Sequence, residues 1–154
     1  MAVTVDVTIS EEVAAADDEV PKPASIQSWA SAACLENVEN DAFISILVSS
    51  PEQSRELNRQ YRDKDKPTNV LSFPMQLPDE VGVHMLGDIV LCAAVIDAEA
   101  RSQSKAESAH WAHMVVHGML HLQGYDHIDN DEAEEMEKLE IQILQTLGIG
   151  NPYE

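Results

Sequence analysis

Histidine residues gather in one short part of the chain. Four of the six histidines follow one another at steps of three, four and four residues, as His110, His113, His117 and His121. An α-helix repeats every 3.6 residues, so these four side chains share one helix face. A row of imidazoles makes a poor surface stripe and an unusual core, whereas a bound metal commonly explains such a row. The spacing therefore points to metal chemistry.

The segment HGMLHLQGYDH, residues 117–127, has the spacing of a metal site. His117 and His121 lie one helical turn apart, so their ring nitrogens can converge on one cation. Gly124 can adopt a positive φ, end the helix and fold the chain back. That return brings His127 toward the same point as a third ligand. Three histidines leave a fourth position for water or substrate, which is typical of a catalytic zinc site rather than a structural one.

The same layout occurs in the metzincin proteases, where a glycine also lies three residues after the second histidine. Those enzymes have a glutamate directly after the first histidine as general base. This sequence has Gly118 at that position, so a metallopeptidase or amide hydrolase is the weaker enzyme alternative. Structural metal sites usually have four closed ligands, often including cysteine, and Cys34 and Cys92 have no suitable spacing. Structural histidines without any metal are a further alternative.

Three neighbouring residues have more than one interpretation. His113 either supports a metal ligand from behind or contacts the substrate, or it is a partly buried, hydrogen-bonded helix residue, and we favour the latter. Asp126 can orient a ligand imidazole, accept a proton, or cap the turn through its own backbone. His84 lies in a glycine-flanked segment and is expected to be a solvated histidine.

Acidic residues dominate the charge of the chain. There are 28 Asp and Glu against 9 Lys and Arg, which gives a formal net charge of −19. This excludes a non-specific nucleic-acid coat protein and a basic membrane-surface helix, because both need clustered positive charge. Five basic residues nevertheless lie close together: Arg55, Arg59, Arg62, Lys64 and Lys66. They form either an anion-binding surface or a solvated helix face with i,i+4 ion pairs.

Strand and helix patterns alternate along the chain. They predict an α+β fold: one domain over residues 1–154, with a small mixed sheet, about five helices, and the metal site on a helix and the loop after it. Strands are expected at 3–9, 43–48, 70–73 and from 88 to 92. Helices are expected from Ser25 as N-cap, from Pro51, and at 93–102, 107–122 and 131–147, with Gly148 as the last stop signal. Residues 10–24 are expected to form an acidic loop or partly helical linker, and residues 75–87 a loop.

The chain shows no sign of membrane insertion or secretion. No apolar run reaches the length needed to cross a bilayer, and the N-terminus lacks the basic and apolar regions of a signal peptide. Two cysteines without a disulfide pattern fit a reducing compartment. We therefore expect a cytoplasmic protein with no membrane partner.

Four segments of the chain closely resemble the bacterial YbeY endoribonuclease, or rRNA maturation factor, family: LNRQYRDKDKPTNVLSFP (57–74), LGDIVLC (86–92), HWAHMVVHGMLHLQGYDH (110–127) and DEAEEMEKLE (131–140). The likeness spans roughly residues 43–153, and the acidic stretch at 11–19 is not part of it. The resemblance implies a zinc-dependent endoribonuclease specific for single-stranded RNA, acting in 16S rRNA maturation and ribosome quality control.

The resemblance also assigns roles to individual residues. His117, His121 and His127 match the family's metal ligands, and Arg62 matches its functionally important arginine. We expect the Arg62 guanidinium to stabilise the negative charge of the transition state, because it is always charged and forks onto phosphate oxygens. Three further basic residues are expected to guide the RNA backbone: Arg59, Lys64 and Lys66. Proton transfer is left open between metal-activated water, Asp126 and the 2′-hydroxyl of the RNA.

The cofactor and the partners have alternatives as well. Imidazole ligands accept zinc, nickel, copper or iron, so zinc rests on the resemblance. The non-enzymatic alternative is a ribosome assembly factor that uses the metal only for stability. Acidic surfaces suit basic ribosomal proteins, so the small ribosomal subunit and its basic proteins are expected partners beside single-stranded RNA and 16S rRNA. The charge distribution predicts a small cationic cleft in an otherwise repulsive surface.

Overall fold

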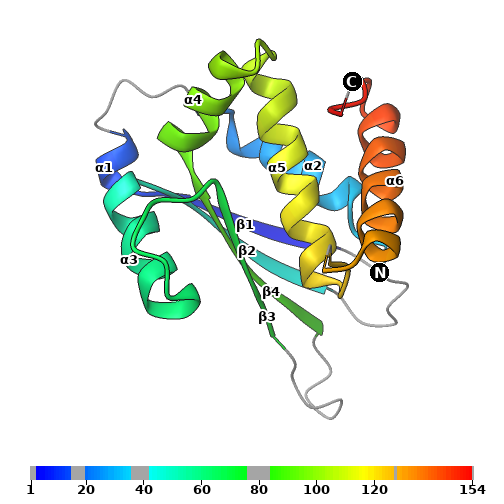
Figure 1. The fold of residues 1–154 in the computed structure, drawn as a ribbon. Coiled ribbons are helices and arrows are strands. Elements are labelled where there is room, and N and C mark those ends of the chain that lie inside the picture. The colour runs from blue at the N-terminus through cyan, green and yellow to red at the C-terminus, as the bar shows by residue number, and fades with distance from the viewer. Residues whose placement is uncertain (1–2, 15–19, 36–41, 76–83, 127, 154) are drawn as a thin grey trace.

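The computed structural model of the protein describes residues 3–14, 20–35, 42–75, 84–126 and 128–153. These residues form a mixed four-stranded sheet with helices on both sides (Figure 1), which confirms the predicted α+β class. The strands are β1 (Val3–Ile9), β2 (Ala42–Ser49), β3 (Val70–Pro74) and β4 (His84–Cys92). The helices are α1 (Glu11–Ala14), α2 (Pro23–Ala32), α3 (Pro51–Arg62), α4 (Ala93–Ser102), α5 (Glu107–Leu122) and α6 (Asn130–Thr146).

The strands lie in the order β1-β2-β4-β3. β1, β2 and β4 run parallel, and β3 pairs antiparallel with β4 at one edge. β2 alternates between buried and half-buried residues, as expected for a strand with one face on the core. Ile46 pairs with Ile89 in β4, and both side chains are fully buried. The strand expected at 43–48 therefore turns every second side chain toward the core.

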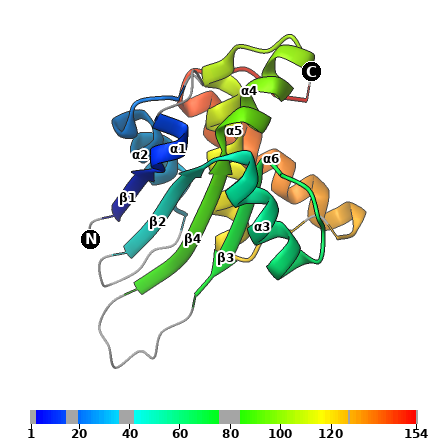
Figure 2. The ribbon, with the colours of Figure 1, turned by 90° about the vertical axis from the view of Figure 1, so that its left-hand side faces the viewer.

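Helices α2 and α5 cover one face of the sheet, and α6 packs against α5 on the outside (Figure 1). Helix α3 lies over the opposite face, beside β3 and β4, as Figure 2 shows. α5 is buried along most of its length because it lies between the sheet and the helices α2, α4 and α6. Trp111, Met119 and Leu120 of α5 are among its fully buried side chains. A helix that is apolar nearly all round occupies the centre of a fold, and α5 holds the histidine row there.

The helix ends follow the predicted local signals. Ser50 caps α3 in a reciprocal capping box with Gln53, and Pro51 occupies the first turn. Gly124, with a φ of 97°, ends α5, and the amide of Tyr125 donates to the carbonyl of Leu120. Gly148, with a φ of 78°, ends α6 in the same way. Glycine reaches positive φ values easily, so these two helix ends could be predicted from the sequence.

Two sequence-based boundaries were wrong. β4 begins at His84 rather than Asp88. Gly87, which was expected in a loop, lies inside this strand with a φ of 140°, beside a shift in the register between β2 and β4. A Cβ on Gly87 would lie 2.2 Å from the carbonyl oxygen of Phe73, so this glycine permits close strand pairing rather than a loop. α2 begins at Pro23 after Lys22, so Ser25 is not its cap. Proline at the first helical position explains the earlier start.

The expected linker at residues 10–24 is partly helical, since α1 occupies Glu11–Ala14. Residues 15–19 lie outside the described part of the chain. No helix among the described residues combines the length and the hydropathy that a bilayer crossing requires.

Candidate functional site

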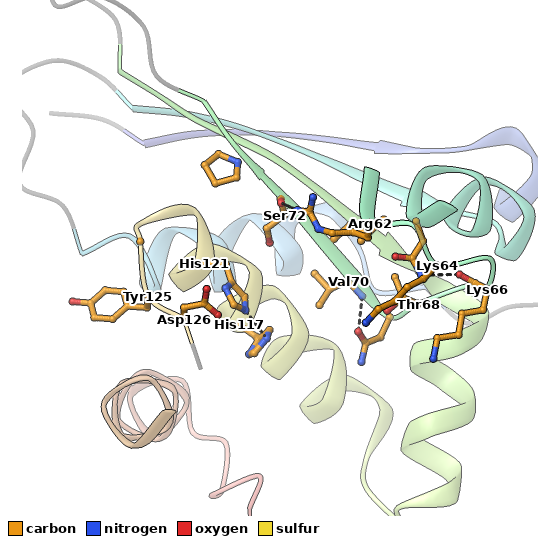
Figure 3. Close-up of a pocket in the computed structure, with 15 residues that line it drawn as sticks. Arg62, Lys64, Lys66, Thr68, Val70, Ser72, His117, His121, Tyr125 and Asp126 are labelled. Atoms are coloured by element: carbon orange, nitrogen blue, oxygen red, sulfur yellow. Dashed lines mark hydrogen bonds between the residues drawn. The ribbon is translucent and has the colours of Figure 1, made fainter. Parts of the chain in front are cut away.

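A cleft of about 770 Å³ opens between α5 and the segment that runs from α3 into β3 (Figure 3). One wall consists of α5 and the turn after it, here called the histidine wall: His117, His121, Gly124, Tyr125 and Asp126. The other wall comes from α3, β3 and the loop between them, here called the basic wall, and its charged members are Arg62, Lys64 and Lys66. Segments far apart in sequence thus face each other across one hollow.

His117 and His121 lie side by side on the cleft face of α5. Their Nε2 atoms are 3.0 Å apart, and their ring centroids are 4.5 Å apart. Both rings therefore direct the same nitrogen toward one point, as their four-residue spacing predicted. Two imidazole nitrogens converging in this way form part of the donor set that zinc accepts.

Behind the histidine wall lies a buried carboxylate on α6. Glu140 is only 1% exposed, and its Oε1 is 2.9 Å from Nδ1 of His117. Its Oε2 is 2.6 Å from Nε2 of His113 and accepts a 2.6 Å hydrogen bond from the hydroxyl of Tyr153. Burial by itself raises the pKa of Glu140, but the hydrogen bonds from His113, His117 and Tyr153 lower that pKa to about 2. The carboxylate is therefore ionised at neutral pH.

The buried carboxylate bears on whether a metal ion fits. An ionised carboxylate only accepts hydrogen bonds, so His117 presents its proton on Nδ1 and the lone pair of Nε2 to the cleft. That is the tautomer a metal ligand needs, and the residues present fit a transition metal such as zinc. Within the described residues no group of three or more His, Cys, Asp or Glu side chains has the arrangement to hold a metal ion by itself. His127, the predicted third ligand, lies outside those residues.

Arg62, the last residue of α3, is held against the neighbouring strand. Its Nη2 donates to the carbonyl of Ser72 at 2.8 Å, and its Nη1 donates to the carbonyl of Tyr61 at 3.2 Å. The guanidinium carbon lies 5.2 Å from the centroid of the Phe73 ring, within the range of a cation–π contact. The positive charge is thus oriented on the basic wall although the side chain is exposed.

Ser72 also joins the two walls of the cleft. Its backbone carbonyl binds Arg62, and its hydroxyl donates to the carbonyl of Gly118 at 3.2 Å. Gly118 is on the side of α5 that faces the sheet, because a Cβ there would lie 3.2 Å from Cγ2 of Ile89 and of Val70. The position after the first histidine therefore points into the core and not into the cleft. A glutamate base, as in the metzincins, would have no place there.

The basic stretch divides into two groups. Lys64 and Lys66 line the cleft with Arg62, and the buried Asn58 holds their loop by donating to the carbonyl of Lys66 at 2.9 Å. Arg55 and Arg59 do not line the cleft. Arg55 is paired with Asp65 at 2.7 Å, and Arg59 with Glu56, around a separate hollow. Arg59, predicted to guide RNA, is thus placed outside the cleft.

The remaining candidates fall in different places. His113 is buried and does not line the cleft, in agreement with a hydrogen-bonded helix residue, but it binds the same carboxylate as His117. His110 is buried, with Nε2 at 3.0 Å from Glu99. Asp126 lies beside His121 on the histidine wall (Figure 3). His84 opens β4.

Sequence reasoning missed the buried carboxylate. Glu140 lies four residues after Met136 and three before Ile143, so it occupies the apolar face of α6 and not the charged face. That position was a readable signal, because an acid on a buried face needs partners. Ser72 and Tyr153 were missed too, and their sequence contexts carry no comparable signal.

Comparison with known proteins gives consistent results. A family model described as endoribonuclease YbeY matches residues 9–148. The chain is 48% identical over 146 residues to an endoribonuclease YbeY from Cellvibrio japonicus, covering 95% of this chain and 82% of that protein. It is also similar in fold to the solution structure of TM1509 from Thermotoga maritima, with a TM-score of 0.52, 22% identity, and coverage of 94% of this chain and 91% of the other.

Proposed function

Because the chain belongs to the endoribonuclease YbeY family, and is on that ground an endoribonuclease, we propose that it cleaves single-stranded RNA with the help of a metal ion. We propose further that it acts in 16S rRNA maturation and ribosome quality control. The observation that carries this proposal is the cleft itself, where two convergent imidazoles face a guanidinium and two lysines across one hollow.

The proposed cofactor is one divalent transition-metal ion, with zinc as the first candidate. His117 and His121 would hold it, with His127 as the third ligand. When bound, such an ion lowers the pKa of a coordinated water and polarises a phosphoryl oxygen. The tautomer imposed on His117 by Glu140 and the 3.0 Å separation of the two Nε2 atoms support this assignment.

Arg62 is proposed to bind and stabilise the phosphate as negative charge builds on it. Its two described hydrogen bonds to the carbonyls of Ser72 and Tyr61 use two of the five guanidinium N–H groups, which leaves others for phosphate oxygens. The Phe73 ring and these carbonyls hold the Arg62 guanidinium in one orientation, so the side chain loses little rotamer freedom when a phosphate binds. Preorganised donors of this kind are the usual source of transition-state stabilisation.

Asp126 is our candidate for proton transfer. It is the one acidic side chain among the described residues that line the cleft. It can take the proton of an attacking water or of the 2′-hydroxyl of the RNA, depending on which oxygen is the nucleophile. The ends of the cleavage products distinguish the two: attack by the 2′-hydroxyl leaves a cyclic phosphate, and attack by water leaves a linear phosphate.

The charge distribution supports a single strand as the substrate. Lys64 and Lys66 add positive charge along the basic wall, while the chain as a whole has a net charge of −19. A flexible strand can enter a local cationic cleft, whereas a stiff duplex must lie against the acidic exterior as well. The exposed acids of α6, such as Glu134 and Glu135, are proposed to meet basic proteins of the small ribosomal subunit.

The test uses purified protein with three substrates: single-stranded RNA, a duplex of the same sequence, and casein. We expect cleavage of the single strand alone, loss of cleavage with a chelator, and recovery when zinc is restored. Elemental analysis should give about one metal ion per chain. Cleavage at the full rate by a metal-free sample would refute the metal mechanism, and casein cleavage without RNA cleavage would favour the peptidase alternative.

A non-catalytic assembly factor makes a different prediction. In that case His121→Ala protein would still sediment with the small ribosomal subunit, and the parent protein would give no metal-dependent RNA products. Subunit binding together with metal-dependent cleavage would instead show that one protein does both.

A further inference from the structure

The carboxylate of Glu140 links two histidines of α5 to the C-terminal segment. Its Oε1 binds Nδ1 of His117 at 2.9 Å, and its Oε2 binds Nε2 of His113 and the hydroxyl of Tyr153, each at 2.6 Å. Glu140 lies on α6, and Tyr153 lies beyond the end of that helix. Three separate parts of the chain therefore meet at one buried acid behind the cleft.

The two oxygens have different tasks. In the described contacts Oε1 binds only His117, while Oε2 accepts the hydrogen bonds from His113 and Tyr153. An ionised carboxylate has no proton to donate, so each neighbour must donate to it. His117 then has its proton on Nδ1, and its Nε2 has a lone pair that points into the cleft.

The contact between the two cleft histidines follows from this assignment. Nε2 of His117 and Nε2 of His121 are 3.0 Å apart, so one of them must donate a hydrogen to the other. Because Nε2 of His117 has no hydrogen, the donor is His121. The two imidazoles are thus unequal: His117 is preset to bind a cation, while His121 must give up its Nε2 proton first.

We propose that Glu140 is the positioning residue of this centre, that it fixes His117 in the Nδ1-protonated tautomer, and that Tyr153 and His113 hold Glu140 in place for that task. This inference rests on the proposed function, because it takes His117 and His121 as metal ligands. It adds a residue on α6 and one from the C-terminal segment to the apparatus of the cleft. A carboxylate behind a ligand histidine orients the ring and raises its basicity.

Nuclear magnetic resonance of the metal-free parent protein tests the tautomer directly. Long-range ¹H–¹⁵N correlation spectra near pH 8.5, well above the ordinary histidine pKa of about 6.5, identify the protonated nitrogen of each ring. We expect the proton on Nδ1 in His117 and on Nε2 in His121. Addition of Zn²⁺ should remove the Nε2 proton of His121 and leave the Nδ1 proton of His117. A proton on Nε2 of His117 would overturn the proposal.

Metal affinity is the second measurement, made by competition with a chromophoric chelator. Glu140→Gln should weaken Zn²⁺ binding by about 10- to 100-fold, the usual effect of removing a partner of a ligand histidine. Tyr153→Phe leaves the His117 contact intact and removes one neutral donor, so a loss below about tenfold is expected. Glu52→Gln, which removes an exposed acid on α3 that does not line the cleft, is the matched control and should leave the affinity unchanged.

A purely structural role for Glu140 gives a distinct result. The melting temperature of Glu140→Gln would fall, while its folded molecules would bind Zn²⁺ as tightly as the parent, and the proposal would be wrong. If Glu140→Gln does not fold, the tautomer of His117 in the parent protein and the Zn²⁺ affinity of Tyr153→Phe still test the proposal. If the folded parent binds no Zn²⁺, Ni²⁺ or Co²⁺, the proposed function itself fails, whatever the tautomer of His117.

Discussion

The two walls of the cleft are built in opposite ways. The histidine wall belongs to the most buried helix of the fold and is supported from behind by a carboxylate that is 1% exposed. The basic wall lies at the end of α3 and in the loop after it, and its cations are exposed side chains, of which Arg62 is held by the backbone carbonyls of Ser72 and Tyr61. The difference matches the physics of the two tasks. Metal ligation demands fixed distances, whereas a phosphate is attracted by charge over several ångströms.

The contrast extends to how each wall depends on distant residues. His117 depends on Glu140, which is 23 positions away on another helix. Arg62 is anchored by Ser72, ten positions away on the next strand. Ser72 also binds Gly118, so the two walls share one hydrogen-bonded junction. We expect damage to the histidine wall to abolish metal binding and cleavage together, and damage to the basic wall to spare metal binding.

The largest effect is expected from His117→Ala. The variant should lose stoichiometric metal and lose RNA cleavage by more than about 100-fold, because removing a ligand costs more than removing the partner behind it. Elemental analysis and single-turnover cleavage of a labelled single strand measure the two losses. A metal-free His117→Ala protein with the parent's activity would show that the histidine wall is not the catalytic one.

Arg62→Glu is the reciprocal change on the basic wall. Cleavage should fall by roughly 10²- to 10³-fold, in the range found for loss of one transition-state donor, while metal content and fold remain those of the parent. Arg62→Lys keeps the charge but not the fork, so it should recover only part of the rate. Equal cleavage by Arg62→Glu and parent would remove Arg62 from the mechanism, and a loss of metal in that variant would contradict the separation of the walls.

Gly118→Glu tests the junction and the protease alternative together. The new carboxylate would lie between α5 and the sheet, close to Ile89 and Val70, so the free energy of unfolding should fall by more than about 3 kcal/mol. Chemical denaturation followed by circular dichroism measures this. Gly150→Glu is the matched control, because nothing lies within 4 Å of a Cβ there, and it should change stability by less than about 0.5 kcal/mol. A stable Gly118→Glu protein with peptidase activity would reverse our interpretation of this position.

The smallest effect is expected from single lysines of the basic wall. Lys66→Ala should lower the slope of log affinity against log salt by about 0.7, the contribution of one phosphate contact on a single strand. Arg59→Ala should change the slope much less, because Arg59 is paired with Glu56 outside the cleft. Filter binding of a short single strand across salt concentrations measures both. A larger change for Arg59 than for Lys66 would restore the guiding role that the sequence suggested for Arg59.

Local signals in the sequence predicted much of the framework. Apolar residue patterns predicted β1 and β2, proline at the first helical position predicted the start of α3, and glycines predicted the ends of α5 and α6. One error occurred where a local signal had a non-local cause. Gly87 was read as part of a loop, yet it lies inside β4 because the strand beside it comes within 2.2 Å of where a Cβ would be.

The sequence alone determined that His117 and His121 share a helix face and that the chain turns back at Gly124. These features depend on backbone geometry within a few residues, which nearest-neighbour sterics fix. Only the tertiary structure decided that Glu140 lies behind His117, that Ser72 joins the two walls, and that Arg59 lies outside the cleft. Those outcomes depend on how the apolar faces of α5, α6 and the sheet pack, and packing involves residues from the whole chain at once.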